Sequence, residues 1–282
     1  MKPLLCIVAP GSMGAAIGAR LVTHGLTVLT HLQGRSERSR ERAAAAGLTV
    51  VAESELVEAD ILLSIVPPGV AWSFADRTAE LIPRSERRLL FAECNAVSPA
   101  VVTGIGQRMS AAGAVFVDAG IIGQPPGPDG SSPRIYASGP AAEQLAVLRQ
   151  YGLDVRVLAK PLGAASALKM CYAGITKGVS AVGSAMLIAS EHAGVADALA
   201  RELADSQAGL RAHLGRTLPS IFGKAYRWVA EMQYIAEFAH EHDPAAAEIF
   251  RGAAALYERI ARTGAAASDD AALIARFLRR DS

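Results

Sequence analysis

Short apolar runs of strand length alternate with helical segments along the first half of the chain. Near-continuous apolar runs of this kind are typical of strands that are buried on both faces of a parallel sheet. Strands are predicted at residues 4–9, 26–30, 60–66, 89–94, 114–118, 134–138 and 153–158, with a helix over 140–150. The alternation predicts an α/β fold with a doubly wound, mostly parallel sheet of the Rossmann type.

The pattern changes after residue 162. From there onward alanine-rich helical periodicity dominates, and no strand-like alternation recurs. We therefore expect two domains: residues 1–161 with the sheet, and an all-α domain over residues 162–282. Because the later helices are too apolar to be solvated on every face, we also expect a homodimer that forms through the second domain.

A glycine-containing turn joins the first predicted strand to the first predicted helix. Residues 9–14 read Ala-Pro-Gly-Ser-Met-Gly, so the dinucleotide fingerprint G-x-G-x-x-G is present except that Ala9 replaces its first glycine. Such a turn lets a pyrophosphate approach the backbone and lie on the helix N-terminus. The residues predicted to bind a dinucleotide are Gly11, Ser12, Met13 and Gly14; the alternative is an ordinary strand-to-helix turn.

The residues after the second predicted strand bear on which dinucleotide binds. Proteins selective for NAD usually carry an acidic residue here for the ribose hydroxyls, but residues 30–36 contain none. Arg35 and Ser36 lie here instead, and a guanidinium can hold a 2′-phosphate through charge-assisted hydrogen bonds. NADP is therefore the expected cofactor, with NAD as a possibility. The alternative is that these side chains belong to the solvated face of a surface helix.

A lysine lies inside an otherwise apolar helix near the predicted domain boundary. Because an ammonium group is costly to bury unpaired, the position of Lys169 calls for an explanation. At 3.6 residues per turn, Lys169 shares a face with Ser166 and Thr176, and Tyr172 flanks it. Partial desolvation would move its pKa toward neutrality, as a general acid or base needs. The alternatives are a lysine that reaches solvent at the helix edge, and Lys177 as the acid/base.

Composition limits which binding partners and which cellular compartment the protein is expected to have. A net charge of +1 gives no support for a nucleic-acid or membrane partner, and 51% hydrophobic with 20% charged residues is typical of a soluble globular protein. No apolar run of membrane-spanning length is expected. Cys6, Cys94 and Cys171 lie in apolar contexts without metal-ligand spacing, which predicts reduced core residues of a cytoplasmic protein. No metal site is predicted, since His240 and His242 do not share a helical face.

Taken together, these motifs resemble the β-hydroxyacid dehydrogenase and 6-phosphogluconate dehydrogenase superfamily, and more narrowly its NAD(P)-binding branch whose C-terminal domain was long of unknown function. The matching motifs are the G-x-M-G turn at 11–14, Val66-Pro67-Pro68 as the loop beside the cofactor, and Gly163 with Lys169 as a G-x-x-x-x-x-K segment. The resemblance implies that Lys169 is the general acid/base. It also implies that the substrate carboxylate lies at Gly120, Ile121, Ile122 and Gly123.

The departures from the family pattern concern the substrate. Tyr172 and Ala173 replace the family's second asparagine, and residues 122–124 replace its serine-glycine-glycine clamp. Tyr172 and Thr176 are therefore expected to contact a changed substrate. Residues 93–96 take the place of an Asp-x-Ser-Thr segment, and Asn95 is expected to contact the nicotinamide ribose or the substrate.

The resemblance implies an NAD(P)-dependent oxidoreductase, and Arg35 and Ser36 favour NADP as its cofactor. Its substrate, a small molecule, would be a hydroxy acid or a sugar acid that reacts at its alcohol or carbonyl carbon. One alternative is an imine or ketone reductase of similar fold, although imine reductases of the family often lack the lysine. The other alternative is a non-catalytic dinucleotide-binding sensor.

Overall fold

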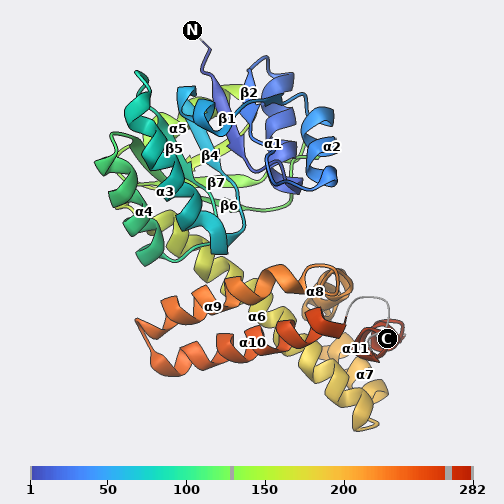
Figure 1. Ribbon diagram of the computed structural model, residues 1–282. Helices are drawn as coiled ribbons and strands as arrows, with labels where there is room; N and C mark the ends of the chain where they lie inside the picture. The colour runs from blue at the N-terminus through green and yellow to red at the C-terminus, as the bar shows by residue number, and fades with distance from the viewer. Residues whose placement is uncertain (1, 128–129, 264–268, 281–282) are drawn as a thin grey trace. The chain divides into compact units, whose positions relative to one another are not determined.

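The computed structural model describes residues 2–127, 130–263 and 269–280 (Figure 1). The chain divides into two compact units, residues 1–170 and residues 171–282. The division falls within one long helix, α6 (Ala164–His192), whereas the sequence placed it just before this helix.

One sheet forms the centre of the first unit, with the strand order β3-β2-β1-β4-β5-β6-β7-β8. Every neighbouring pair is parallel except β6 and β7. The strands are β1 (Leu5–Val8), β2 (Val28–Thr30), β3 (Thr49–Val50), β4 (Ile61–Ser64), β5 (Leu90–Glu93), β6 (Val115–Ile122), β7 (Arg134–Ser138) and β8 (Asp154–Val157). The predicted Rossmann-type, mostly parallel sheet is confirmed.

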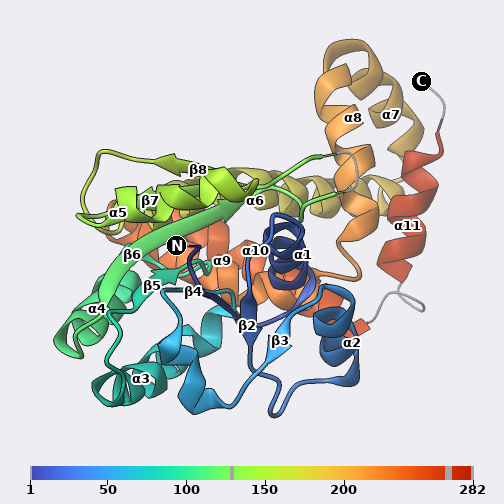
Figure 2. The same ribbon diagram turned by 90° about the horizontal axis from the view of Figure 1, so that it is seen from above.

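Helices cover both faces of this sheet, as its crossover connections require. They are α1 (Ser12–Thr23), α2 (Glu37–Ala45), α3 (Ala71–Leu81), α4 (Pro99–Ala111) and α5 (Ala142–Leu145). One core cluster joins α1, α2 and α5 to alternate strand residues such as Ile7 and Leu63. The other joins α3 and α4 to the intervening residues such as Leu62 and Phe91 (Figure 2). The period-2 alternation of buried strands thus places one apolar set on each face.

Three predicted elements of the first unit need correction. Strand β6 continues to Ile122, four residues beyond the predicted end, because antiparallel pairing with β7 extends it. Only α5 is α-helical in the helix predicted over 140–150, and residues 146–151 form a 3-10 helix. Strand β3 was missed because two exposed residues carry no hydrophobic pattern.

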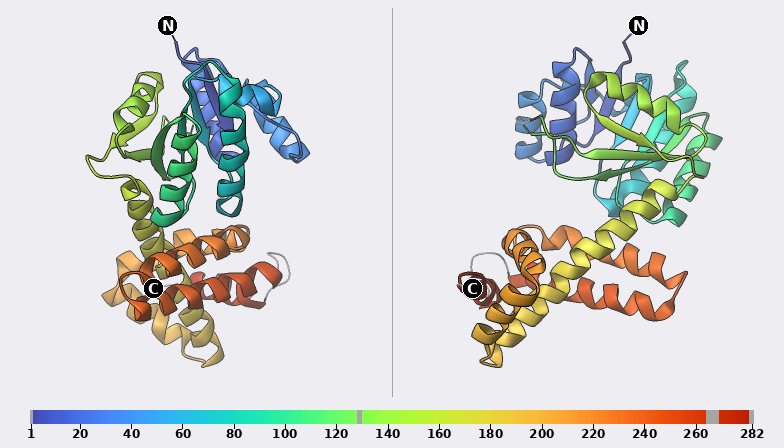
Figure 3. Two further views of the ribbon diagram at one scale, coloured as in Figure 1. Left: turned by 60° about the vertical axis from the view of Figure 1, so that its left-hand side comes forward. Right: turned by 180° about the vertical axis from the view of Figure 1, so that it is seen from behind.

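The second unit is helical throughout its described residues. After α6 it contains α7 (Ala196–Ser206), α8 (Ala208–Thr217), α9 (Ala225–His240), α10 (Pro244–Thr263) and α11 (Asp269–Leu278). Helices α9 and α10 lie side by side (Figure 3). Between them the rings of Trp228 and Tyr257 meet edge to face, with centroids 5.2 Å apart. The predicted all-α character of the C-terminal region is confirmed.

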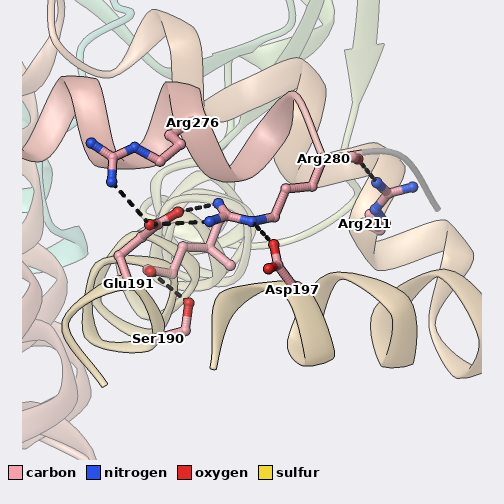
Figure 4. Close-up of polar contacts among 7 residues, drawn as sticks. Ser190, Glu191, Asp197, Arg211, Arg276 and Arg280 are labelled. Carbon is pink, nitrogen blue, oxygen red and sulfur yellow. Dashed lines mark hydrogen bonds and ion pairs between the residues drawn. The ribbon is translucent and has the colours of Figure 1, made fainter. Parts of the chain in front are cut away.

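Ion pairs and hydrogen bonds among charged residues hold the end of α11 in place within the second unit (Figure 4). The Glu191 carboxylate is almost fully buried and accepts hydrogen bonds from Arg280. The same guanidinium bonds Asp197 through Nε at 2.5 Å, which lowers the pKa of that carboxyl. Arg211 in turn donates to the Arg280 carbonyl oxygen. Because a buried carboxylate needs a charge partner, the cluster attaches α11 to α6, α7 and α8.

Two expectations about α6 are wrong. The helix contains an 18-residue window with a mean hydropathy of 1.2, so by length and composition it passes the test for a membrane span, and 39% of that window is buried. Interspersed serine, threonine and lysine residues hid this window from a search for unbroken apolar runs. Cys171 is exposed rather than part of a core, because it lies on a helix face that its own unit leaves uncovered.

Candidate active site

The fingerprint turn leads from β1 directly into α1. Gly11 is the N-cap residue, in extended conformation, and its N–H donates to the Ala9 carbonyl oxygen at 2.8 Å. A Cβ atom at Gly14 would lie 2.2 Å from the Ala9 carbonyl oxygen, so only glycine allows the helix to pack this closely on the strand. The first-turn amides of Ser12, Met13 and Gly14 have no helical partners, which is the donor set that a pyrophosphate requires.

Arg35 and Ser36 lie in the segment after β2, just before α2. Ser36 is the N-cap of α2, and its hydroxyl lies 3.2 Å from that of Ser39. Arg35 is half-buried, and within the described part of the chain its guanidinium has no hydrogen bond or ion pair. A guanidinium without an acidic partner beside a dinucleotide fingerprint suits a phosphate ligand.

A row of buried polar side chains crosses the sheet near its carboxyl edge. Ser64 on β4 is in register with Glu93 on β5, Glu93 with Asp118 on β6, and Asp118 with Ser138 on β7. Each is at most 1% exposed. Because residues in register point to the same face, the four side chains form one continuous row. Buried polar groups need hydrogen-bond partners. The side chains of this row find theirs at the beginning of α6 and at Asn95, which follows β5.

Asp118 and Ser138 hold the beginning of α6. One oxygen of Asp118 accepts hydrogen bonds from the backbone N–H groups of Ala165 and Ser166, at 3.0 and 3.1 Å, and from the Ser138 hydroxyl at 2.8 Å. Its other oxygen accepts from the Ser166 hydroxyl at 2.7 Å. The carboxylate therefore satisfies the orphan amides of a helix N-terminus, where a negative charge is also favoured by the helix dipole.

Gly120 brings the same helix close to β6. A Cβ atom at this position would lie 2.8 Å from the Ala165 carbonyl oxygen and 3.4 Å from Cβ of Lys169. Lys169 is half-buried, and its Nζ donates to the Cys94 carbonyl oxygen at 3.4 Å, just beyond the end of β5. The predicted acid/base residue thus lies beside Gly120, at the edge where open α/β sheets bind ligands.

Asn95 lies next to this position but is almost fully buried. Its Oδ1 accepts from the Val66 N–H at 2.7 Å, and its Nδ2 donates to the Ser64 hydroxyl and to Oε1 of Glu93. These contacts show a side chain that positions the predicted cofactor-binding turn at Val66 and Pro67. Direct contact between Asn95 and a dinucleotide stays a prediction.

Sequence reasoning missed Glu93 as part of this site. The carboxyl is fully buried, and loss of solvation raises its pKa to about 7 against the opposing effects of hydrogen bonds from Ser64 and Asn95 and the charge of Lys169. Its Oε1 accepts from the N–H and the Nδ2 of Asn95. Only its position at the end of a buried strand, in place of the family's aspartate, could have singled it out.

The predicted substrate residues fall in both units. Ile121 and Ile122 are buried in β6, and Gly123 follows in the left-handed region, at φ 126°. Tyr172 is half-exposed on α6, and its carbonyl oxygen accepts from the Thr176 hydroxyl at 2.9 Å. Tyr172 and Thr176 belong to the second unit, so their place beside Lys169 stays a prediction.

Lys177, the competing acid/base candidate, has partners within the second unit. Its ammonium forms an ion pair with the largely buried carboxylate of Glu231 and lies 5.2 Å from the centroid of the Trp228 ring. The Tyr257 hydroxyl donates to its carbonyl oxygen at 2.6 Å. These contacts give Lys177 a structural explanation that needs no substrate. The described residues contain no group of three histidine, cysteine or acidic side chains that could hold a metal ion.

Two family models match the chain. The one described as the NAD binding domain of 6-phosphogluconate dehydrogenase matches residues 5–149, which is more than half of the 282 residues. The other, described as a domain of unknown function (DUF1932), matches residues 190–260. The mitochondrial 3-hydroxyisobutyrate dehydrogenase of Drosophila melanogaster is 30% identical over 141 residues, 49% of this chain and 42% of that enzyme. The matched region thus spans less than half of that relative's length.

Two solved structures extend the likeness over nearly the whole chain. A conserved protein of unknown function, whose structure is similar to 3-hydroxyacid dehydrogenases, superposes with a TM-score of 0.68 at 28% identity, over 91% of this chain and 98% of its own. The 3-hydroxyisobutyrate dehydrogenase of Mycobacterium tuberculosis, solved with L-serine, gives 0.72 at 19% identity, over 99% and 100%. At that lower identity the likeness is one of fold.

Proposed function

This chain belongs to the family of the NAD-binding domain of 6-phosphogluconate dehydrogenase, as its motifs predicted, and we propose that it is an NADP-dependent oxidoreductase. Its reaction transfers a hydride between nicotinamide and the alcohol or carbonyl carbon of a small hydroxy acid or sugar acid. The observation that carries the proposal is the position of Lys169. Asp118 and Gly120 hold its helix against the carboxyl edge of the sheet, the edge from which the fingerprint turn also leaves β1.

Lys169 handles the proton in this proposal. The nicotinamide ring, when bound, supplies the two-electron redox chemistry. During alcohol oxidation, neutral Lys169 accepts the hydroxyl proton at Nζ; during reduction, its ammonium returns a proton to the carbonyl oxygen. The Cys94 carbonyl oxygen orients Nζ by accepting one of its hydrogen bonds.

Arg35 sets the cofactor preference in this account. NADP(H) should bind more tightly than NAD(H), and Arg35→Ala should remove most of the difference, because a hydrogen bond to a charged group contributes about 1.5–3 kcal/mol. Titrating both cofactors against the wild type and the variant measures this. Arg40→Ala is the matched control, since Arg40 lies on α2 and pairs with Glu37. Equal affinities of the wild type for the two cofactors would contradict the preference.

The substrate is proposed to be a small molecule held by residues 120–123 together with Tyr172 and Thr176. A panel of hydroxy acids and sugar acids, including 3-hydroxyisobutyrate because of the Drosophila relative, tests this with NADP and with NAD. We expect substrate-dependent formation of reduced cofactor with at least one member. Turnover of imines or ketones alone would favour a reductase, and cofactor binding without any turnover would favour a sensor.

Conditions inside the cytoplasm fit this proposal. All three cysteines are free, and Cys6 and Cys94 are buried as the sequence predicted. A net charge near zero and a small-molecule reaction call for no nucleic-acid or membrane partner. We therefore assign the buried residues of α6 after Met170 to the core of the second unit rather than to a membrane.

The exposed side of α6 supports the proposed homodimer. Ile175, Val182 and Met186 are 68%, 59% and 56% exposed. They follow one another at intervals of seven and four residues, which is the spacing of an apolar seam between two paired helices. A two-fold axis lets the same stripe on a second copy cover this one, since an isologous interface is self-complementary.

Replacing residues of this apolar stripe should dissociate the dimer. The double variant Ile175→Glu/Val182→Glu should be monomeric by light scattering at micromolar concentration, because each copy would have to bury two charges of like sign in the interface. Ile249→Glu is the control: this side chain on α10 is also exposed but lies outside the stripe. A monomeric wild type at the same concentration would rule out the dimer.

A further inference from the structure

Glu93 carries a buried carboxyl group that has no role in the proposed reaction. Its carboxyl lies in the polar row across β4, β5 and β6, and it is 1% exposed. Oε1 accepts two hydrogen bonds from Asn95, whereas Oε2 is buried and has no hydrogen-bond partner among the described residues. A buried carboxylate oxygen without a donor is costly, and protonation lowers that cost because it removes the charge.

The groups that face this carboxyl come from four places. β4 contributes the Ser64 hydroxyl, the segment after β5 contributes Asn95 and Cys94, β6 contributes Asp118, and α6 contributes Lys169. Among these, Lys169 is the cation, and its charge lowers the pKa of Glu93 while burial raises it to about 7. The Lys169 ammonium is bonded to the carbonyl oxygen of Cys94, the residue that follows Glu93. The backbone that directly follows Glu93 therefore contacts the Lys169 ammonium, whose charge acts on the Glu93 carboxyl.

We propose that Glu93 is a positioning residue for Lys169: by its own gain or loss of a proton it sets the charge state of that amine. The proposal rests on the proposed role of Lys169 in proton transfer. Ionised Glu93 attracts the Lys169 ammonium and stabilises it, whereas neutral Glu93 does not. Because coupled sites titrate together, the protonation of Glu93 near neutral pH should change the protonation of Lys169 as well. Glu93 also fixes Asn95, and through it the Val66 turn, so that both parts of the site share one buried group.

The titration of Lys169 can be followed without any substrate. The chain contains only five lysines, so reductive methylation with ¹³C-formaldehyde gives few NMR signals, and the Lys169→Arg variant assigns the one from Lys169. In the wild type we expect the Lys169 signal to show two inflections, one from its own proton and one near neutral pH from Glu93. A Lys169 signal with a single inflection would contradict the proposal.

Variants at Glu93 identify the source of the second inflection. Glu93→Gln should abolish it and move the inflection of Lys169 itself to lower pH by about one unit, the smaller end of the range for a nearby opposite charge. Glu93→Asp keeps the carboxyl and should retain two inflections, which a merely space-filling role would not require. Glu143→Gln, at an exposed position on α5, is the control and should change neither.

The outcomes separate this proposal from the proposed function. Unchanged Lys169 titration in Glu93→Gln overturns the coupling, even if the enzyme oxidises a hydroxy acid. Loss of the neutral inflection in Glu93→Gln supports the coupling, even if no member of the substrate panel reacts. If Glu93→Gln does not fold, the wild type and Glu93→Asp still decide, because the coupling requires two inflections in each.

Discussion

Lys169→Ala should lower turnover by a factor of about 10²–10⁴, the usual contribution of a general acid or base, while leaving NADP(H) affinity nearly unchanged. Turnover and cofactor affinity should respond differently because residues 11–14 build the pyrophosphate site, whereas Nζ of Lys169 lies at the end of β5. Lys169→Arg should not restore activity, because a guanidinium stays protonated and cannot accept the hydroxyl proton. Steady-state rates with the panel substrate, together with cofactor titrations, measure both quantities.

Lys177→Ala is the matched control for this prediction. Its loss leaves the largely buried Glu231 carboxylate without its ion-pair partner, so a lower stability is expected rather than a loss of chemistry. The rate of the folded Lys177 variant should stay within a few-fold of the wild type. Comparable losses of turnover in both variants would place the acid/base assignment in doubt, and full activity in Lys169→Ala would refute it.

Asp118→Ala should lower the free energy of unfolding by about 3–5 kcal/mol, because buried donors left without an acceptor cost roughly 1–3 kcal/mol each. The variant removes the acceptor of two backbone amides and two hydroxyls at the start of α6. Ser138 can still accept from the Ala165 N–H at 3.0 Å, which limits the loss. Urea denaturation followed by circular dichroism measures the change.

The control for Asp118 is an exposed carboxylate of the same sheet. Asp154 pairs with Arg156 on the surface of β8, and Asp154→Ala should change stability by less than about 1 kcal/mol, as surface ion pairs do. Similar losses in the two variants would mean that the buried row does not anchor α6. A folded Asp118→Ala preparation should also lose turnover, since the helix that carries Lys169 would no longer be fixed.

The sequence singled out those parts of the candidate site that depend on local pattern. Ala9 to Gly14 could be recognised because strand, turn and helix follow one another within one short segment, and Gly14 proves to need the absence of a Cβ atom. Lys169 stood out because a cation interrupts an apolar helix. The Rossmann-type sheet followed from the alternation of strands and helices.

The other parts of the candidate site depend on the register between strands that are distant in the sequence, and no local pattern encodes that register. Glu93 and Asp118 end up side by side because β5 and β6 pair at those two residues. The sequence could not reveal that the Asn95 side-chain amide forms hydrogen bonds with Val66, Ser64 and Glu93 inside the protein. Cys171 likewise proved exposed, because helical periodicity gives a face but not what covers it.

The most direct test of the central claim follows deuterium from the reacting carbon of the substrate. A hydroxy acid deuterated at its carbinol carbon is mixed with excess enzyme and NADP in a single turnover, and the label in the cofactor is measured by mass spectrometry. The wild type and Lys177→Ala should move the label onto the nicotinamide ring at similar rates, and Lys169→Ala should do so more slowly by a factor of about 10²–10⁴. Transfer by Lys169→Ala at the wild-type rate, or unlabelled reduced cofactor from the wild type, would contradict the account.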